Sequence, residues 1–324
     1  MVLTPVRAAL LTLGAALFLV AGCQSPGHRA ATPAPPDPRP LDGVLTYAAA
    51  DEAALWQAEE SAVRACMRAR GHAYRVGEEA ADRRAAGDSP FALLRPDEAR
   101  NDGYGLTSAH LAGTPPDPNA EHLATLTAKE RRHWRDALLG EEENHRTVEL
   151  PGGLVMSHDP GSCVSRAQTE VYGERWPELY YTVQELSNAV IGATQESAAF
   201  RRAQREWAGC MKERGHRYRA LDDPRQEIRA LLEDEGETGD EESLRTVGLR
   251  ELELAGADVD CQVESGLHQV VEAAAKEAGR PLVEESRAEL KRYERARKAA
   301  LSALDRQGAF AVARGPAAEG LGRR

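Results

Sequence analysis

Aromatic residues are scarce in this chain, which has 324 residues but only 4 Phe, 4 Trp and 8 Tyr. A hydrophobic content of 42% still permits a buried core, so that core must consist mostly of Ala, Leu and Val. Positive charge is also in deficit, because 41 Lys and Arg face 52 Asp and Glu and leave a formal net charge of −11. This acidity argues against nucleic acid or anionic lipid headgroups as partners.

Familiar catalytic motifs are absent from the sequence. It contains no Gly-x-Ser-x-Gly, His-Glu-x-x-His, Ser-x-x-Lys or Cys-x-x-Cys pattern and no glycine-rich phosphate loop. A pair of carboxylates that hydrolyses cell-wall glycan needs only the right geometry, so a wall-active hydrolase stays open as an alternative. The balance favours a protein that is not an enzyme and takes no cofactor.

An uncharged run follows Arg7 and extends from Ala8 to Val20. It is too short to span a bilayer, which needs about 20 apolar residues, and it fits the apolar region of an export signal. The sequence Leu19-Val20-Ala21-Gly22-Cys23 then resembles the lipobox of bacterial lipoproteins, in which the cysteine sulfur carries a diacylglycerol. We therefore predict a signal peptide over residues 1–22 and lipidation of Cys23, with an ordinary secretory signal as the alternative.

A proline-rich stretch comes after the predicted lipid anchor. Six prolines lie between Gln24 and Pro40, with hardly any large apolar side chain among them. Such a sequence favours extended polyproline II and, at about 3.1 Å per residue, would separate the fold from the bilayer by roughly 50 Å. We predict that residues 23–41 form a solvated tether that does not pack, and that the protein lies outside the cell membrane, anchored through the lipid on Cys23.

Four cysteines remain once Cys23 carries lipid. Thiols oxidise in exported proteins, so an even number indicates two disulfides, and four cysteines allow three pairings. These cysteines are Cys66, Cys163, Cys210 and Cys261.

An internal repeat selects one pairing. Residues 64–75 read Arg-Ala-Cys-Met-Arg-Ala-Arg-Gly-His-Ala-Tyr-Arg, and residues 208–219 read Ala-Gly-Cys-Met-Lys-Glu-Arg-Gly-His-Arg-Tyr-Arg, identical at seven of twelve positions. Each segment predicts a helix that ends in a Schellman cap, with its glycine in the left-handed conformation and its histidine against its methionine. If the halves are duplicates, each closes its own bridge, so we predict Cys66–Cys163 and Cys210–Cys261.

Several of these segments together resemble a family of uncharacterised exported actinobacterial lipoproteins. The resemblance covers most of the mature chain and rests on the repeated Cys-Met-x-x-x-Gly-His segments, Gly-Ser-Cys163, Ala-Leu-Leu-Gly140 and Ala257-Asp-Val-Asp-Cys261. Members often carry Phe at the positions of His72 and His216, which implies a packing role for both histidines. The family supplies no activity.

The repeated Cys-x5-His spacing also permits a metal site, because thiolate and imidazole both bind zinc. It pairs Cys66 with His72 and Cys210 with His216, but it matches no familiar zinc finger, and the compartment is oxidising. We expect no metal and keep a metal-binding envelope protein as a further alternative. The acidic stretch from Glu233 to Glu242 lacks the alternating ligands of an EF-hand and predicts a solvated loop.

The fold class predicted is mainly α, with two duplicated helical halves, each held by one disulfide, and a small β-hairpin. The halves would be residues 42–173 and 174–306, followed by a disordered tail over residues 307–324. Residues Asp88 to Asn119 are expected to form a long irregular loop. The predicted helices are Thr127–Gly140, Ser162–Tyr172, Pro177–Ile191, Gln195–Arg214, Pro224–Glu233, Glu242–Ala278 and Pro281–Asp305, and the predicted hairpin joins His145–Leu150 to Leu154–Ser157.

Aromatic side chains gather where the two halves join, at Tyr172, Trp176, Tyr180 and Tyr181. They could face a sugar or peptide ligand, although packing of the junction is the favoured explanation. We expect a membrane-tethered, non-enzymatic binding or accessory module of the cell envelope. Its partners would be the membrane, through the lipid, and an envelope protein complex or cell-wall component, with the oligomeric state left open.

Overall fold

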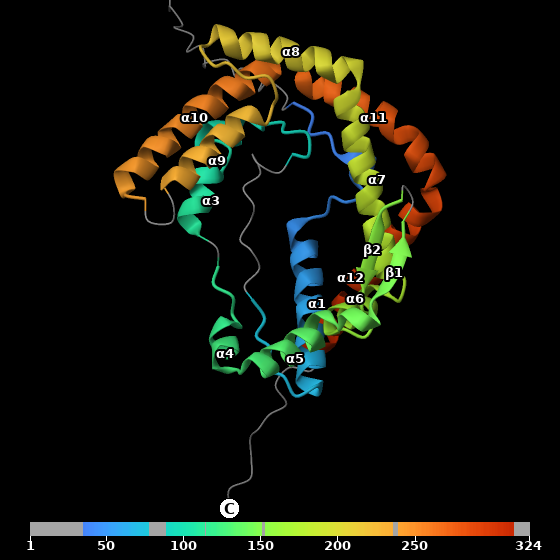
Figure 1. The fold of residues 1–324 in the computed structure, drawn as a ribbon. Helices are drawn as coiled ribbons and strands as arrows, with labels where there is room; N and C mark the ends of the chain where they lie inside the picture. Colours follow the sequence, from blue (N-terminus) through green and yellow to red (C-terminus); the bar gives the residue numbers. More distant parts are fainter. Residues whose placement is uncertain (1–34, 78–88, 114, 151–152, 236–238, 314–324) are drawn as a thin grey trace, which may run out of the picture. The chain divides into compact units, whose positions relative to one another are not determined.

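A computed structural model describes residues 35–77, 89–113, 115–150, 153–235 and 239–313 of the chain. The described part is mainly helical, with a two-stranded antiparallel sheet and two disulfides, as predicted (Figure 1). Its elements are η1 (Pro40–Gly43), α1 (Ala49–Ala69), α2 (Pro96–Asp102), α3 (Leu106–Ala112), α4 (Ala120–Thr125), α5 (Ala128–Leu139), η3 (Glu142–Asn144), β1 (Arg146–Glu149), β2 (Val155–His158), α6 (Cys163–Tyr172), α7 (Trp176–Glu196), α8 (Ala198–Glu213), α9 (Asp223–Glu235), α10 (Glu241–Glu264), α11 (Leu267–Glu285) and α12 (Arg287–Ala313).

The two repeated segments end helices α1 and α8 in the same way. In each, the backbone N–H of the histidine donates to the carbonyl of the methionine five positions earlier at 2.9 Å. The intervening glycines have φ values of +81° and +93°, where a side chain would be strained, and both methionines are fully buried. The predicted Schellman caps are therefore confirmed. The residues concerned are Met67, Gly71 and His72 in α1 and Met211, Gly215 and His216 in α8.

Both disulfides have the predicted pairing. Cys66–Cys163 joins α1 to α6, and Cys210–Cys261 joins α8 to α10. The bridges close loops of 97 and 51 residues. In the chain-entropy model, each bridge stabilises the fold by about 4 to 5 kcal/mol.

Local signals also place α5 and the hairpin correctly. The Thr127 side chain accepts from the N–H of Glu130, while the Glu130 carboxylate accepts from the N–H of Thr127, which completes the predicted capping box. Strands β1 and β2 pair antiparallel, with Val148 opposite Met156. Residues 151–152 of the connecting turn lie outside the described residues.

The expectation of an irregular loop between residues 88 and 119 is wrong for residues 96–102 and 106–112, which are helical. This segment contains α2, which begins at Pro96, and α3, which begins after Gly105. Both helices are only seven residues long and pack on α10. Helices this short gain too little from their own hydrogen bonds to be stable alone, so tertiary contacts create them, and periodicity did not reveal them.

The long helix expected from Glu242 to Ala278 is also wrong. Gly266, at φ +62°, ends α10, and α11 begins at the fully buried Leu267. Pro281 lies inside α11, not in the first turn of a new helix. The break at Gly266 places Leu267 in the core, and this tertiary gain outweighs the helix propensity of the surrounding sequence.

Residues 35–41, which we expected to belong to a solvated tether, are packed instead. Pro38, Pro40 and Leu41 are buried, and η1 lies against α7 and α11. The carbonyl of Pro36 accepts a hydrogen bond of 2.8 Å from Nδ1 of the buried His268. Proline is apolar and loses little entropy when it packs, so it can add to the core despite its usual place in tethers.

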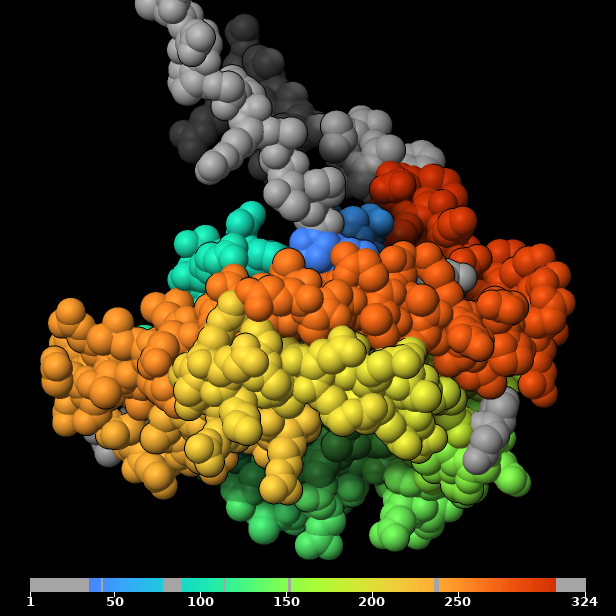
Figure 2. Space-filling model, turned by 90° about the horizontal axis from the view of Figure 1, so that it is seen from above, coloured from blue at the N-terminus to red at the C-terminus, as the bar shows by residue number. Residues whose placement is uncertain are grey.

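Packing crosses the predicted boundary between the halves. Helices α2 and α3 lie on α10, and α12 lies on α1 and α6. Figure 2 shows α8, in yellow, along α10 and α11, in orange, in agreement with their contacts. Helix α12 continues to Ala313, past Gln307 where we expected a tail, and residues 314–324 lie outside the described residues.

Candidate functional site: a leucine groove between α3 and α10

The aromatic residues singled out in the sequence pack mainly on one another. Trp176 is buried, with Tyr172 stacked on it at a centroid distance of 3.9 Å and Tyr293 stacked on it at 4.9 Å. The hydroxyl of Tyr172 contacts Oε1 of Glu59 at 2.5 Å. Trp176 therefore fills the junction of α6, α7 and α12. The rings of Tyr180 and Tyr181 meet edge to face at 5.3 Å, and Tyr181 is exposed.

The repeated cysteine–histidine pairs do not form metal sites. All four cysteines are in disulfides, so neither His72 nor His216 has a thiolate beside it. Within the described ranges, no group of three or more His, Cys, Asp and Glu side chains is placed to hold a metal ion.

A groove of about 600 Å³ lies between α3 and α10, and exposed leucines line it. Leu111 on α3 is 65% exposed, and Leu249 and Leu252 on α10 are 60% and 37% exposed. Single exposed leucines are ordinary, but three around one groove form an apolar surface of the kind that binds a partner. Leu244 is half-buried in the same groove.

A buried carboxylate fixes the α3 wall of the groove. The two oxygens of Glu251 accept hydrogen bonds of 2.8 Å each from the backbone N–H groups of Leu106 and Thr107. Glu251 thus caps the first turn of α3, where N–H groups have no partner within the helix. Gly103, at φ +64°, allows this approach, since a Cβ there would lie 2.6 Å from Cγ of Glu251.

A second buried carboxylate holds the chain between α2 and α3. Oδ1 of Asp258 accepts from Nε1 of Trp207 at 2.8 Å and from Nε2 of Gln262 at 2.9 Å, and Oδ2 accepts from the Tyr104 hydroxyl at 3.1 Å. Burial, reinforced by the charge of Asp258, raises the pKa of Tyr104, so its hydroxyl stays protonated and continues to donate. Three elements thereby meet at a single buried side chain.

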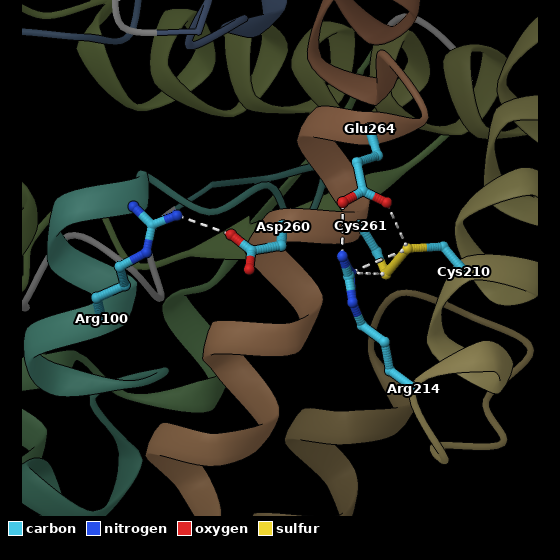
Figure 3. A network of polar contacts seen from close by, with 6 residues as sticks. All are labelled: Arg100, Cys210, Arg214, Asp260, Cys261 and Glu264. Atoms are coloured by element: carbon cyan, nitrogen blue, oxygen red, sulfur yellow. Dashed lines mark hydrogen bonds and ion pairs between the residues drawn. A yellow bond between two sulfur atoms is a disulfide. The ribbon is translucent and has the colours of Figure 1, made fainter.

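Surface ion pairing adds to these buried contacts. Arg100 of α2 meets Asp260 of α10 at 2.7 Å (Figure 3). Because α2 and α3 are tied to α10 by side chains along its length, the groove is formed before any ligand arrives. A preformed surface binds without the cost of ordering its own walls.

The start of α10 brings both Glu241 and Arg245 into the lining of the groove, and further acidic residues lie beside it in the chain. Glu241 lines the groove at the start of α10, and Asp240 caps that helix by accepting from the N–H of Ser243. This hydrogen bond lowers the pKa of Asp240, which therefore keeps its negative charge. The acidic residues of the described chain from the end of α9 to the start of α10 are Glu233, Asp234, Glu235, Asp240, Glu241 and Glu242.

One residue that lines the groove has a buried polar atom without a protein partner in the described structure. Oγ1 of Thr107 makes no hydrogen bond within the described structure, although Thr107 is only 8% exposed. Because this oxygen is shielded from solvent, a chain bound in the groove does not contact it directly.

Sequence reasoning did not find this groove. The pair Gly103 and Gly105 marked only a loop, whereas the glycines let the backbone approach Glu251 and begin α3. The exposed pair Leu249 and Leu252, three positions apart on one helical face, was the remaining local signal.

Comparisons with known proteins supply no relative. No protein family, curated protein or solved structure matches the chain. No helix among the described residues has the length and apolar character needed to cross a membrane.

Proposed function

We propose that the chain is a lipid-anchored binding module of the cell envelope, whose groove between α3 and α10 holds an apolar, basic segment of another protein. The preformed groove with its exposed leucines, Leu111, Leu249 and Leu252, carries this proposal. Its volume lies in the range of about 300 to 1,000 Å³ that is usual for ligand sites.

The chemistry of the groove specifies the occupant. Leucines from two helices suit an amphipathic helix that presents apolar residues at positions i, i+3, i+4 and i+7. The acidic residues at and beside the start of α10 favour lysine or arginine at one end of that helix.

A synthetic peptide tests the groove directly. The probe is a fluorescently labelled, leucine-rich amphipathic helix with lysines at one end. We would measure its binding to the mature protein by fluorescence anisotropy. Leu249→Asp should weaken binding about ten-fold or more, because burying one leucine contributes roughly 1.5 to 3 kcal/mol. A peptide with glutamates in place of the lysines should bind more weakly.

Val263→Asp is the matched control, since Val263 lies on the same helix, is 52% exposed and does not line the groove. It should bind the peptide as the wild type does. Absence of measurable binding to the wild type, or equal weakening by the two substitutions, would overturn the proposed occupant.

The anchor is a separate part of the proposal and rests on the lipobox ending at Cys23. Radiolabelled palmitate should enter the protein in its native host, and Cys23→Ala should abolish the label. Persistent labelling of Cys23→Ala would remove the lipoprotein assignment and leave the groove untouched.

A further inference from the structure

An arginine lies directly against one of the two disulfides. Nη1 of Arg214 is 3.0 Å from Sγ of Cys261 and 3.2 Å from Sγ of Cys210 (Figure 3). Nη2 of the same guanidinium contacts Oε1 of Glu264 at 2.5 Å. Oε2 of Glu264 lies 3.3 Å from Sγ of Cys210, and because a disulfide sulfur carries no proton, this contact places negative charge beside Cys210 without a hydrogen bond.

The other disulfide has an arginine at the equivalent position of the repeat, but its charge is used differently. Arg70 follows Cys66 by four residues, as Arg214 follows Cys210. Its guanidinium donates to the backbone carbonyls of Ala137 at 3.3 Å and Gly161 at 2.5 Å. Arg70 therefore fastens α1 to neighbouring segments, whereas Arg214 faces sulfur.

The two bridges are alike in the burial of their cysteines, so burial does not distinguish them. In each bridge the cysteine of the repeat, Cys66 or Cys210, is half-buried, and its partner, Cys163 or Cys261, is fully buried. An external thiol therefore reaches the repeat cysteine first in both bridges. The buried sulfur becomes the leaving group.

We propose that Cys210–Cys261 is a thiol–disulfide exchange site that reacts with dithiol reductants. A thiolate of the dithiol attacks Sγ of Cys210, the S–S bond breaks, and its electron pair leaves on Sγ of Cys261 as a thiolate beside Arg214. The second thiol of the reductant loses its proton and attacks the mixed disulfide, which releases Cys210 as a thiolate that takes up a proton. The protein bridge is reduced, and the dithiol is oxidised to a disulfide.

Electrostatics assigns the roles of the two sulfurs. A guanidinium at hydrogen-bonding distance favours the thiolate form of Cys261, and a leaving thiol of lower pKa leaves faster. Arg214 makes its shorter sulfur contact with Cys261, the buried member of the pair. Glu264 opposes this effect in two ways. Its ion pair with Arg214 partly neutralises the guanidinium, and its carboxylate disfavours negative charge near Cys210.

The fold around the bridge is held by other contacts when the bridge opens. Trp207 of α8 donates to Asp258 of α10 at 2.8 Å, and both residues are fully buried. Helices α8 and α10 stay packed through this bond and their shared core. Reduction at Cys210 leaves these contacts in place, while the fold loses the roughly 4 kcal/mol that the bridge contributes in the chain-entropy model.

The test compares the two bridges within one molecule. The oxidised mature protein would be treated briefly with dithiothreitol, quenched with an alkylating agent and analysed by mass spectrometry for the four cysteines separately. In the wild type we expect Cys210–Cys261 to be reduced about ten-fold faster than Cys66–Cys163, given the dependence of exchange on the leaving thiol. Equal rates would overturn the proposal.

Substitutions then identify the cause. Arg214→Gln should slow reduction of Cys210–Cys261 by roughly three- to ten-fold, whereas Arg70→Gln should leave the rate at Cys66–Cys163 within about two-fold of the wild type. Glu264→Gln, at an exposed side chain, should accelerate the reaction and keeps the proposal testable if Arg214→Gln folds poorly. Unchanged rates at Cys210–Cys261 in both Arg214→Gln and Glu264→Gln would refute the role of the charge.

Discussion

Replacement of Gly103 by alanine tests how the wall of the groove is built. Gly103 ends α2 at φ +64° and ψ −131°, a conformation that residues with a side chain rarely adopt. A Cβ at this position would lie 2.6 Å from Cγ and 3.0 Å from Cδ of Glu251. Glu251 must then move, and it is the residue whose carboxylate caps α3.

Two separable costs make up the expected effect. The backbone conformation costs alanine about 1 to 3 kcal/mol. Displacement of Glu251 breaks at least one of its hydrogen bonds to Leu106 and Thr107, and a hydrogen bond to a buried charged group contributes about 1.5 to 3 kcal/mol. Gly103→Ala should therefore lower the free energy of unfolding by roughly 2.5 to 6 kcal/mol, the sum of the two costs.

Gly113→Ala measures the first cost alone. Gly113 ends α3 at φ +68° and ψ 176°, and no atom outside its neighbours lies within 4 Å of a Cβ built there. Urea unfolding of both variants gives the difference, which should be about 2 kcal/mol or more. Amide hydrogen exchange at Leu106 and Thr107 should accelerate only in Gly103→Ala. If the two variants unfold alike and exchange alike, Glu251 does not fix the wall.

Two further predictions concern buried polar side chains. Burial lowers the pKa of His268, so the unfolded chain binds a proton at this residue more readily than the folded chain does. The stability that neutral His268 contributes is therefore fully present above its ordinary pKa of 6.5. It declines as the pH falls below that value. In His268→Asn, which can still donate to Pro36, urea unfolding at pH 5 and pH 7.5 should show a smaller loss on acidification than in the wild type. Asp258→Ala leaves the donors of Trp207 and Tyr104 unpaired and should lower the free energy of unfolding by about 3 to 5 kcal/mol, whereas Asp258→Asn, which keeps an acceptor, should cost clearly less in the same assay.

Features encoded within a few residues of one another could be predicted from the sequence. The capping box of Thr127 and Glu130 and the glycine-ended helices before His72 and His216 depend on contacts across three to five positions. The disulfide pairing followed from comparing the two repeated segments. In the caps, the residues that form the specifying hydrogen bonds lie close together in the chain.

The groove depends on contacts that no local pattern contains. The N–H groups that begin α3 are capped by Glu251, which is 145 positions from Leu106. The backbone N–H of Leu94 donates to Gln262 across 168 positions. A segment of seven helical residues with its cap so far away resembles a loop in sequence, and that is how residues 88–119 were misjudged.

The packed residues after Pro36 were missed for a related reason. Proline-rich sequence is typical of solvated tethers, and nothing within it reveals that His268 supplies a hydrogen-bond donor and that α7 and α11 cover Leu41. Composition describes what a segment does alone. Its burial depends on a surface formed elsewhere in the chain.

The two repeated segments show how similar sequences acquire different chemistry. Both form the same cap and carry an arginine four positions after the bridged cysteine. Around Arg70, the carbonyls of Ala137 and Gly161 accept its guanidinium, because α5 and the chain before α6 lie there. Around Arg214, the neighbouring helix offers Glu264 and the sulfurs instead. The reactivity proposed for Cys210–Cys261 thus arises from the residues that pack against the repeated segment. The residues shared by the two segments therefore predict the same helix cap in both, but they do not predict the same role for the arginine beside each disulfide.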